Sequence, residues 1–166
     1  MAFTHNLEKA SLLFSRILLW IGGLILVVMI LLTCANIFLR TVWFPVRGTF
    51  ELMGYGGAVV TAFALAYTQI HRGHIAVDIL VLGFSKRIRK VLNAMNHLIL
   101  MAFFAVVTWQ MAKYAKTLLS SGELTETLQI VYYPFTYAVA LGCLVLALVF
   151  LTDFMKSLFH QEKEEP

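Results

Sequence analysis

The stretch ILLWIGGLILVVMILLTCANIFL, residues 17–39, runs for 23 residues without Asp, Glu, Lys, Arg or His. Comparable apolar stretches follow at residues 52–70, 91–112 and 127–152, and the middle one contains a single histidine, His97. An α-helix rises about 1.5 Å per residue, so about 20 residues cross a hydrocarbon core of about 30 Å. None of the stretches alternates polar and apolar residues as a membrane strand would. The sequence therefore predicts an all-α integral membrane protein with four transmembrane helices in a single membrane domain, residues 1–166.

Lysine and arginine are unevenly distributed between these stretches. If both termini and residues 71–90 lie on the cytoplasmic side, that side holds nine of the 13 Lys and Arg residues. Positive charge is enriched in cytoplasmic loops, so we expect an N-in, C-in topology with a basic interfacial segment between the second and third helices. The net charge of +4 is then explained by topology and by contact with membrane lipids, and it does not require nucleic acid as a partner.

The second apolar stretch repeats a small residue every four positions, at Gly54, Ala58, Ala62 and Ala66. On a helix these residues form one ribbon without bulk, which lets another helix approach closely. Gly142 in the fourth stretch belongs to a weaker version of the same pattern. Two interpretations stay open for the ribbon: packing among the four helices of this chain, or packing against a helix of a partner protein.

Two charged residues flank the short connection between the first two predicted helices. Arg40 ends the first helix and Glu51 begins the second, with Pro45 and Gly48 turning the chain between them. A charge at a membrane boundary is tolerated when it is paired or reaches the interface. We therefore expect a helix-end ion pair between Arg40 and Glu51, with contact to a partner protein as the second interpretation.

Beyond the second stretch, His74 and Asp78 are four residues apart, so on a helix the carboxylate could hold the imidazole. Two nearby histidines and one carboxylate make a poor metal site, and we expect a structural corner. No pairing of a nucleophile with a base is evident elsewhere, so the sequence predicts no catalytic residues, no cofactor, no metal and no enzyme.

A set of motifs resembles the small membrane subunit, the Q-type subunit, of tripartite ATP-independent periplasmic (TRAP) transporters. It consists of Asn36-x-x-x-Arg40, the Trp/Phe/Pro turn, Glu51, the small-residue helix and Gly73-His74-Ile75-x-Val77-Asp78. Residues 127–130 leading to Gly142 also resemble that family, although Val131 stands where a proline commonly follows.

This resemblance implies a scaffold subunit that moves no solute by itself. Its partners would be a large multi-span, elevator-type membrane subunit that carries the solute with sodium ions, and a periplasmic substrate-binding protein that delivers an organic acid. It also implies a multi-pass protein of the bacterial inner membrane that helps to dock the binding protein outside.

Two alternatives of other classes remain. A haem-binding membrane anchor of a respiratory complex needs two histidines at matched depth, for which His71 and His97 are conceivable. A small exporter with a single membrane carboxylate would have to use Glu51, which lies at an interface with Arg40 close by in the sequence.

Overall fold

The computed structural model describes residues 2–73 and 85–159. They form four helices: α1 (Ala2–Val42), α2 (Thr49–Ile70), α4 (Lys86–Ser121) and α5 (Tyr133–Phe159). Each is long and apolar enough to cross a membrane, and within the described ranges the only strand-like feature is one isolated bridge between Leu124 and Val131. The predicted fold class is confirmed, whereas the N-in, C-in orientation stays a prediction.

The helix boundaries differ from those of the apolar stretches, except at the end of α2. α1 begins 15 residues before residue 17, and α4 continues to Ser121, where Gly122 adopts a left-handed conformation with φ 66° and its N–H bonds to the carbonyl of Leu118. Glycine adopts this conformation without the clash of a Cβ, which is why it commonly ends helices. The apolar content thus locates the segments that cross lipid, but the caps decide where the helices end.

The prediction that the fourth helix starts at residue 127 is wrong, because α5 starts at Tyr133. Residues 122–132 form a loop in which the backbone N–H of Thr125 donates to Ile130 O at 3.0 Å, and the backbone N–H of Ile130 donates to the hydroxyl oxygen of Thr125 at 3.3 Å. Gln129 has a φ of 53°, which a helix does not allow. Pro134 then occupies the first turn of α5, where its missing N–H costs no helical hydrogen bond.

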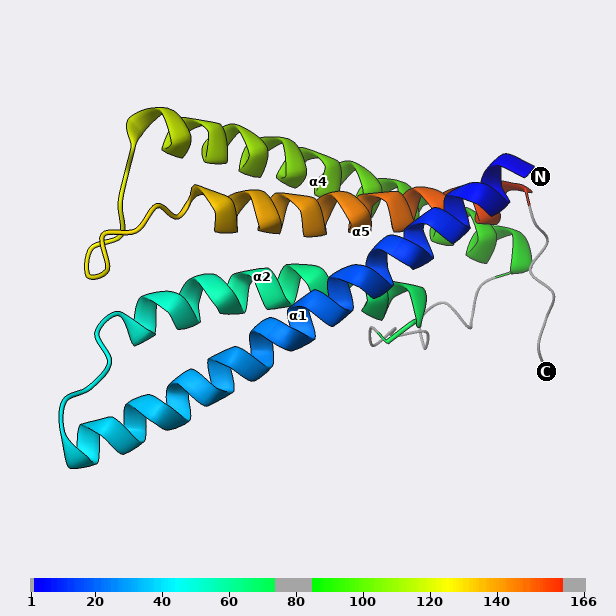
Figure 1. Cartoon of the computed structure of the whole chain (residues 1–166). Coiled ribbons are helices and arrows are strands. Elements are labelled where there is room, and N and C mark those ends of the chain that lie inside the picture. Colours follow the sequence, from blue (N-terminus) through cyan, green and yellow to red (C-terminus); the bar gives the residue numbers. More distant parts are fainter. Residues whose placement is uncertain (1, 74–84, 160–166) are drawn as a thin grey trace.

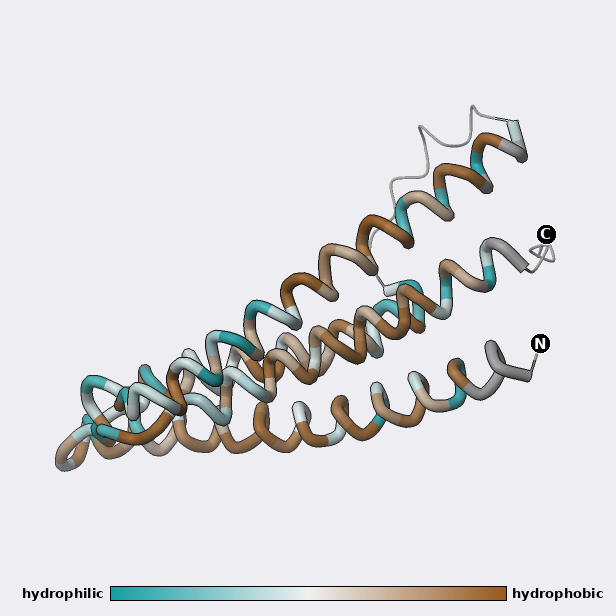
Figure 2. The backbone as a smooth tube through the Cα atoms, turned by 90° about the horizontal axis from the view of Figure 1, so that it is seen from above, coloured by the Kyte–Doolittle hydropathy of each residue, from teal (hydrophilic) through white to brown (hydrophobic). Residues whose placement is uncertain are grey.

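The helices do not form a closed square. α4 packs against α5, α5 against α2, and α2 against α1, so that they lie side by side in this order near the two connections that join them in pairs (Figure 1). Towards the chain termini α1 crosses α2 obliquely and also contacts α5. Apolar residues run along all four helices (Figure 2). We call the end that holds residues 43–48 and 122–132 the loop end.

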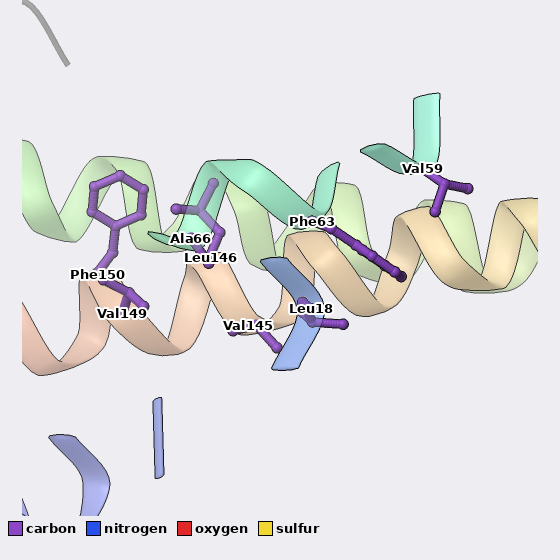
Figure 3. Close-up of a cluster of buried hydrophobic side chains, with 8 residues drawn as sticks. All are labelled: Leu18, Val59, Phe63, Ala66, Val145, Leu146, Val149 and Phe150. Atoms are coloured by element: carbon purple, nitrogen blue, oxygen red, sulfur yellow. The ribbon is translucent and has the colours of Figure 1, made fainter. Parts of the chain in front are cut away.

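The core lies where α2 and α5 meet, with α1 laid across them. Its buried side chains come from three helices (Figure 3): Leu18 from α1, Val59, Phe63 and Ala66 from α2, and Val145, Leu146, Val149 and Phe150 from α5. In an 18-residue apolar window of each span, half of the α5 residues are buried and none of the α4 residues are. α4 has buried side chains, Ala115 and Leu118, near its C-terminal end. α5 is therefore the central helix, and α4 is a peripheral one.

Gly142 brings α2 and α5 into close contact at the centre of this core. A Cβ built on Gly142 would lie 2.6 Å from the carbonyl oxygen of Ala62 and 2.9 Å from its Cβ. Close approach of backbones through small residues is how membrane helices gain van der Waals contact where lipid removes the hydrophobic drive. The crossing therefore depends on the absence of a side chain at position 142.

Candidate partner-contact surfaces

The small-residue ribbon of α2 is divided between the interior and the surface. Ala62 and Ala66 are 4% and 0% exposed and lie inside the chain's own bundle. Gly54 and Ala58 are exposed, and a Cβ on Gly54 would meet no atom within 4 Å. Packing inside the chain thus accounts for half of the ribbon, and the other half is exposed.

The exposed side of α2 differs from the exposed sides of α1 and α4. Across residues 49–70, all of which the structure describes, Phe50 at the helix start is the only exposed large apolar side chain. On α1 and α4 the exposed side chains include many of Leu, Ile, Val, Phe and Trp, among them Trp20 at 77% and Trp109 at 74%. The surface of α2 is instead made of small residues, and we call Gly54, Ala58 and Thr61 the small-residue face of α2.

Glycines also hold α1 against α2. A Cβ on Gly56 would lie 2.8 Å from the sulfur of Met29, and one on Gly22 would lie 3.4 Å from the Cβ of Phe63. Between the two helices runs an apolar groove of about 340 Å³, lined by Leu19, Trp20, Gly22, Gly23, Leu26, Val60 and Ala64. The sequence analysis singled out neither Gly56 nor Gly22.

At the loop end, the ion pair predicted between Arg40 and Glu51 is not among the interactions of the described residues. Both carboxylate oxygens of Glu51 accept backbone N–H groups from the α4–α5 loop, Thr127 at 2.6 Å and Leu128 at 3.1 Å. These donors are 76 and 77 residues away in sequence. Residues far away in sequence thus take the place expected for Arg40, and proximity along the chain does not reveal them. Contact of Arg40 with a partner stays a prediction.

Asn36, which belongs to the same family-like motif as Arg40, stabilises the α1–α2 turn. Its Oδ1 accepts the backbone N–H of Val46 at 2.8 Å, and the hydroxyl of Thr49 donates to the carbonyl of the same Val46 at 2.8 Å. A buried or half-buried backbone group needs such a partner. The turn is therefore built from local hydrogen bonds, and Glu51 is left to bind the other loop.

At the opposite end, two long-range polar contacts join the helices. The side-chain amide of Gln69 on α2 donates to Asp153 on α5 at 3.1 Å, and Lys156 on α5 pairs with Glu8 on α1 at 2.6 Å. The sequence analysis named none of these contacts, since no spacing within one helix reveals a pair formed between two. His74 and Asp78, the predicted corner, lie outside the described residues.

Within residues 2–73 and 85–159 no cluster of three or more His, Cys, Asp or Glu side chains could hold a metal ion. His71 packs against Tyr67, and His97 packs near Phe150 with its Nδ1 buried and without a partner among the described residues. Neither contact amounts to a cofactor site.

A family model agrees with the motifs and the four-helix architecture. Residues 29–160 match the family described as the DctQ component of tripartite ATP-independent periplasmic transporters. No curated protein and no solved structure is significantly similar to the chain. The match covers well over half of the chain, from the middle of α1 through α5. The chain therefore belongs to the DctQ family, the small membrane components of TRAP transporters.

Proposed function

We propose that this chain is a static scaffold subunit that packs against the large multi-span membrane subunit of its transporter. The carrying observation is the exposed small-residue face of α2, because helix interfaces in membranes are enriched in Gly, Ala and Thr. Lipid-facing surfaces carry bulky apolar side chains, as α1 and α4 do here. The family supports the existence of such a partner, since its members are components of tripartite assemblies.

The proposal extends to the activity of the assembly. The large subunit would carry an organic acid together with sodium ions, and a periplasmic binding protein would deliver the solute. The chain would reside in the bacterial inner membrane with both termini and residues 71–90 in the cytoplasm, and with the loop end facing the periplasm. The distribution of Lys and Arg and the family's periplasmic component support this placement.

Ala58→Leu tests the packing proposal. We expect the substitution to reduce the amount of this chain that co-purifies with an affinity-tagged large subunit at least tenfold, because a leucine side chain would keep the two helices apart. The matched control is Ala105→Leu, the same change at an exposed alanine of α4. Both variants should melt like the wild type when purified alone. Undiminished co-purification of Ala58→Leu would contradict the proposal.

Topology is tested with single cysteines in a background of Cys34→Ala and Cys143→Ala. An impermeant thiol reagent should label Arg47→Cys and Ser120→Cys in intact spheroplasts and leave Ser85→Cys unlabelled until the membrane is opened. Ser120 is exposed and lies in the last turn of α4, so it avoids the left-handed Gly122. The reverse labelling pattern would mean that the loop end faces the cytoplasm.

A further inference from the structure

The α4–α5 loop, residues 122–132, is an ordered element, which we call the strap. Thr125 is 4% exposed and organises it: its backbone N–H bonds to Ile130 O, its carbonyl accepts Gln129 N–H, and its hydroxyl oxygen accepts Ile130 N–H. Leu124 and Val131 form a bridge across its base. These hydrogen bonds give the strap one conformation.

Glu51 ties the strap to the other helical pair. Its two oxygens accept two consecutive backbone N–H groups, those of Thr127 and Leu128. Hydrogen bonds to an ionised acceptor are about twice as strong as those between neutral groups. The side chain of Leu128 lies directly against Gly48 in the α1–α2 turn, where no Cβ intervenes. One polar and one apolar contact therefore position the strap.

At its C-terminal end, the strap joins the bundle through aromatic rings. Tyr132 stacks on Tyr55 of α2, with ring centroids 5.5 Å apart, and Phe135 stacks on the same Tyr55 at 5.5 Å. Burial, followed by a hydrogen bond to Glu123, raises the pKa of Tyr132. The strap is thus held at its middle by Glu51 and at its C-terminal end by Tyr55.

This positioned strap exposes apolar side chains beside acidic ones. Leu124, Ile130 and Val131 are 49%, 36% and 44% exposed, and Glu123 and Glu126 are exposed as well. Residues 122–132 contain no Lys or Arg. Exposed apolar groups outside the spans mark contact with a protein or with the membrane. Anionic headgroups repel an acidic segment, whereas a basic protein surface complements it.

We propose that the strap is a contact surface for a soluble extramembrane protein with a basic face, and that Glu51 is the residue that positions it. The inference rests on the proposed function, in which a soluble binding protein approaches the loop end. It assigns the contact with that protein to the strap. Glu51 does not itself touch the soluble protein. It acts by fixing the strap on which Ile130, Val131 and Glu126 are presented.

The contact between Glu51 and the strap is tested first, by hydrogen exchange of individual amides in the full complex with the large subunit. We expect Glu51→Ala to raise exchange at Thr127 and Leu128 at least tenfold, and Glu51→Gln to raise it less because its amide oxygen still accepts a hydrogen bond. Glu126→Gln and Arg40→Gln are controls that should leave both amides protected. Unchanged exchange in Glu51→Ala would overturn the role of Glu51.

The contact is tested by the affinity of the complex, in nanodiscs, for the soluble binding protein. We expect Glu126→Lys and Glu51→Ala each to weaken binding at least tenfold while co-purification with the large subunit stays normal. Lys116→Glu, an opposite charge reversal on α4, is the control and should not weaken it. If Glu126→Lys and Glu51→Ala both bind normally, only this inference is overturned. If the wild-type complex does not bind the soluble protein, the proposed function is overturned as well.

A nitroxide at Val131→Cys, in the background without Cys34 and Cys143, separates a protein contact from a membrane contact. We expect the label to be reached by a water-soluble relaxation agent in the free complex and to be shielded when the soluble protein binds. Preferential access for oxygen dissolved in the bilayer would show that the strap lies in the membrane interface, and the inference would then be wrong.

Discussion

Gly142→Ala is expected to destabilise the chain more than any other exchange of glycine for alanine within a helix. The new Cβ would lie 2.6 Å and 2.7 Å from the carbonyl oxygen and carbon of Ala62, which are backbone atoms that cannot turn aside. Overpacking a tight core typically costs about 1–3 kcal/mol. We expect a lower unfolding temperature in detergent, measured by the loss of the monodisperse peak in size-exclusion chromatography after heating.

Gly54→Ala is the matched control for this experiment. Both positions are helical glycines, but a Cβ on Gly54 meets no atom of the chain within 4 Å. Alanine is favoured over glycine in a helix by about 1 kcal/mol, so Gly54→Ala should melt at the wild-type temperature or above it. Equal melting of Gly142→Ala and Gly54→Ala would mean that α2 and α5 do not approach as closely as described.

Gly48→Ala is expected to detach the strap from the α1–α2 turn. Gly48 has a φ of 73°, which costs a residue with a Cβ about 1–2 kcal/mol. The Cβ would also collide with the Cγ of Leu128, a branch point that cannot move without the rest of its side chain. We therefore expect faster amide exchange at Leu128 and a lower unfolding temperature.

Two further variants separate the backbone strain at position 48 from the collision with Leu128. Gly122 also has a positive φ, 66°, but a Cβ there meets nothing within 4 Å, so Gly122→Ala should show the backbone cost alone. Adding Leu128→Ala to Gly48→Ala removes the collision and should recover part of the lost stability. If Gly48→Ala behaves like Gly122→Ala, the contact with Leu128 contributes nothing.

The membrane-crossing segments could be predicted from composition, because a helix can cross the hydrocarbon core when its apolar stretch is long enough. The helix ends could not. Residues 127–132 belong to an apolar stretch, yet the backbone N–H groups of residues 127–130 bond to Thr125 and to the distant Glu51. A search for apolar segments does not reveal these competing hydrogen bonds. Residues 2–16 lie outside the apolar stretch, yet they continue α1.

The candidate contact residues show the same limit. The four-residue spacing in α2 predicted close helix packing, and two of its four members, Ala62 and Ala66, are buried. Spacing cannot tell which members of a ribbon face the interior, since this depends on where α5 and α1 cross α2. For Glu51, the charge and its place at a helix start pointed to a polar contact, but its partner is set by the tertiary fold.

The oblique course of α1 affects the mechanics of the bundle. Helices packed side by side can slide along their axes, and such shear needs only small shifts of interdigitated side chains. α1 contacts α2 through Gly22 and Gly56 and reaches α5 nearer the termini, where Ser11 and Ser15 are buried and Glu8 meets Lys156. A helix fixed to two neighbours at different heights acts as a diagonal brace, so that sliding of α2 along α5 would have to break contacts at both places. The bundle is therefore stiff against sliding of α2 along α5, and its outer surface keeps one shape.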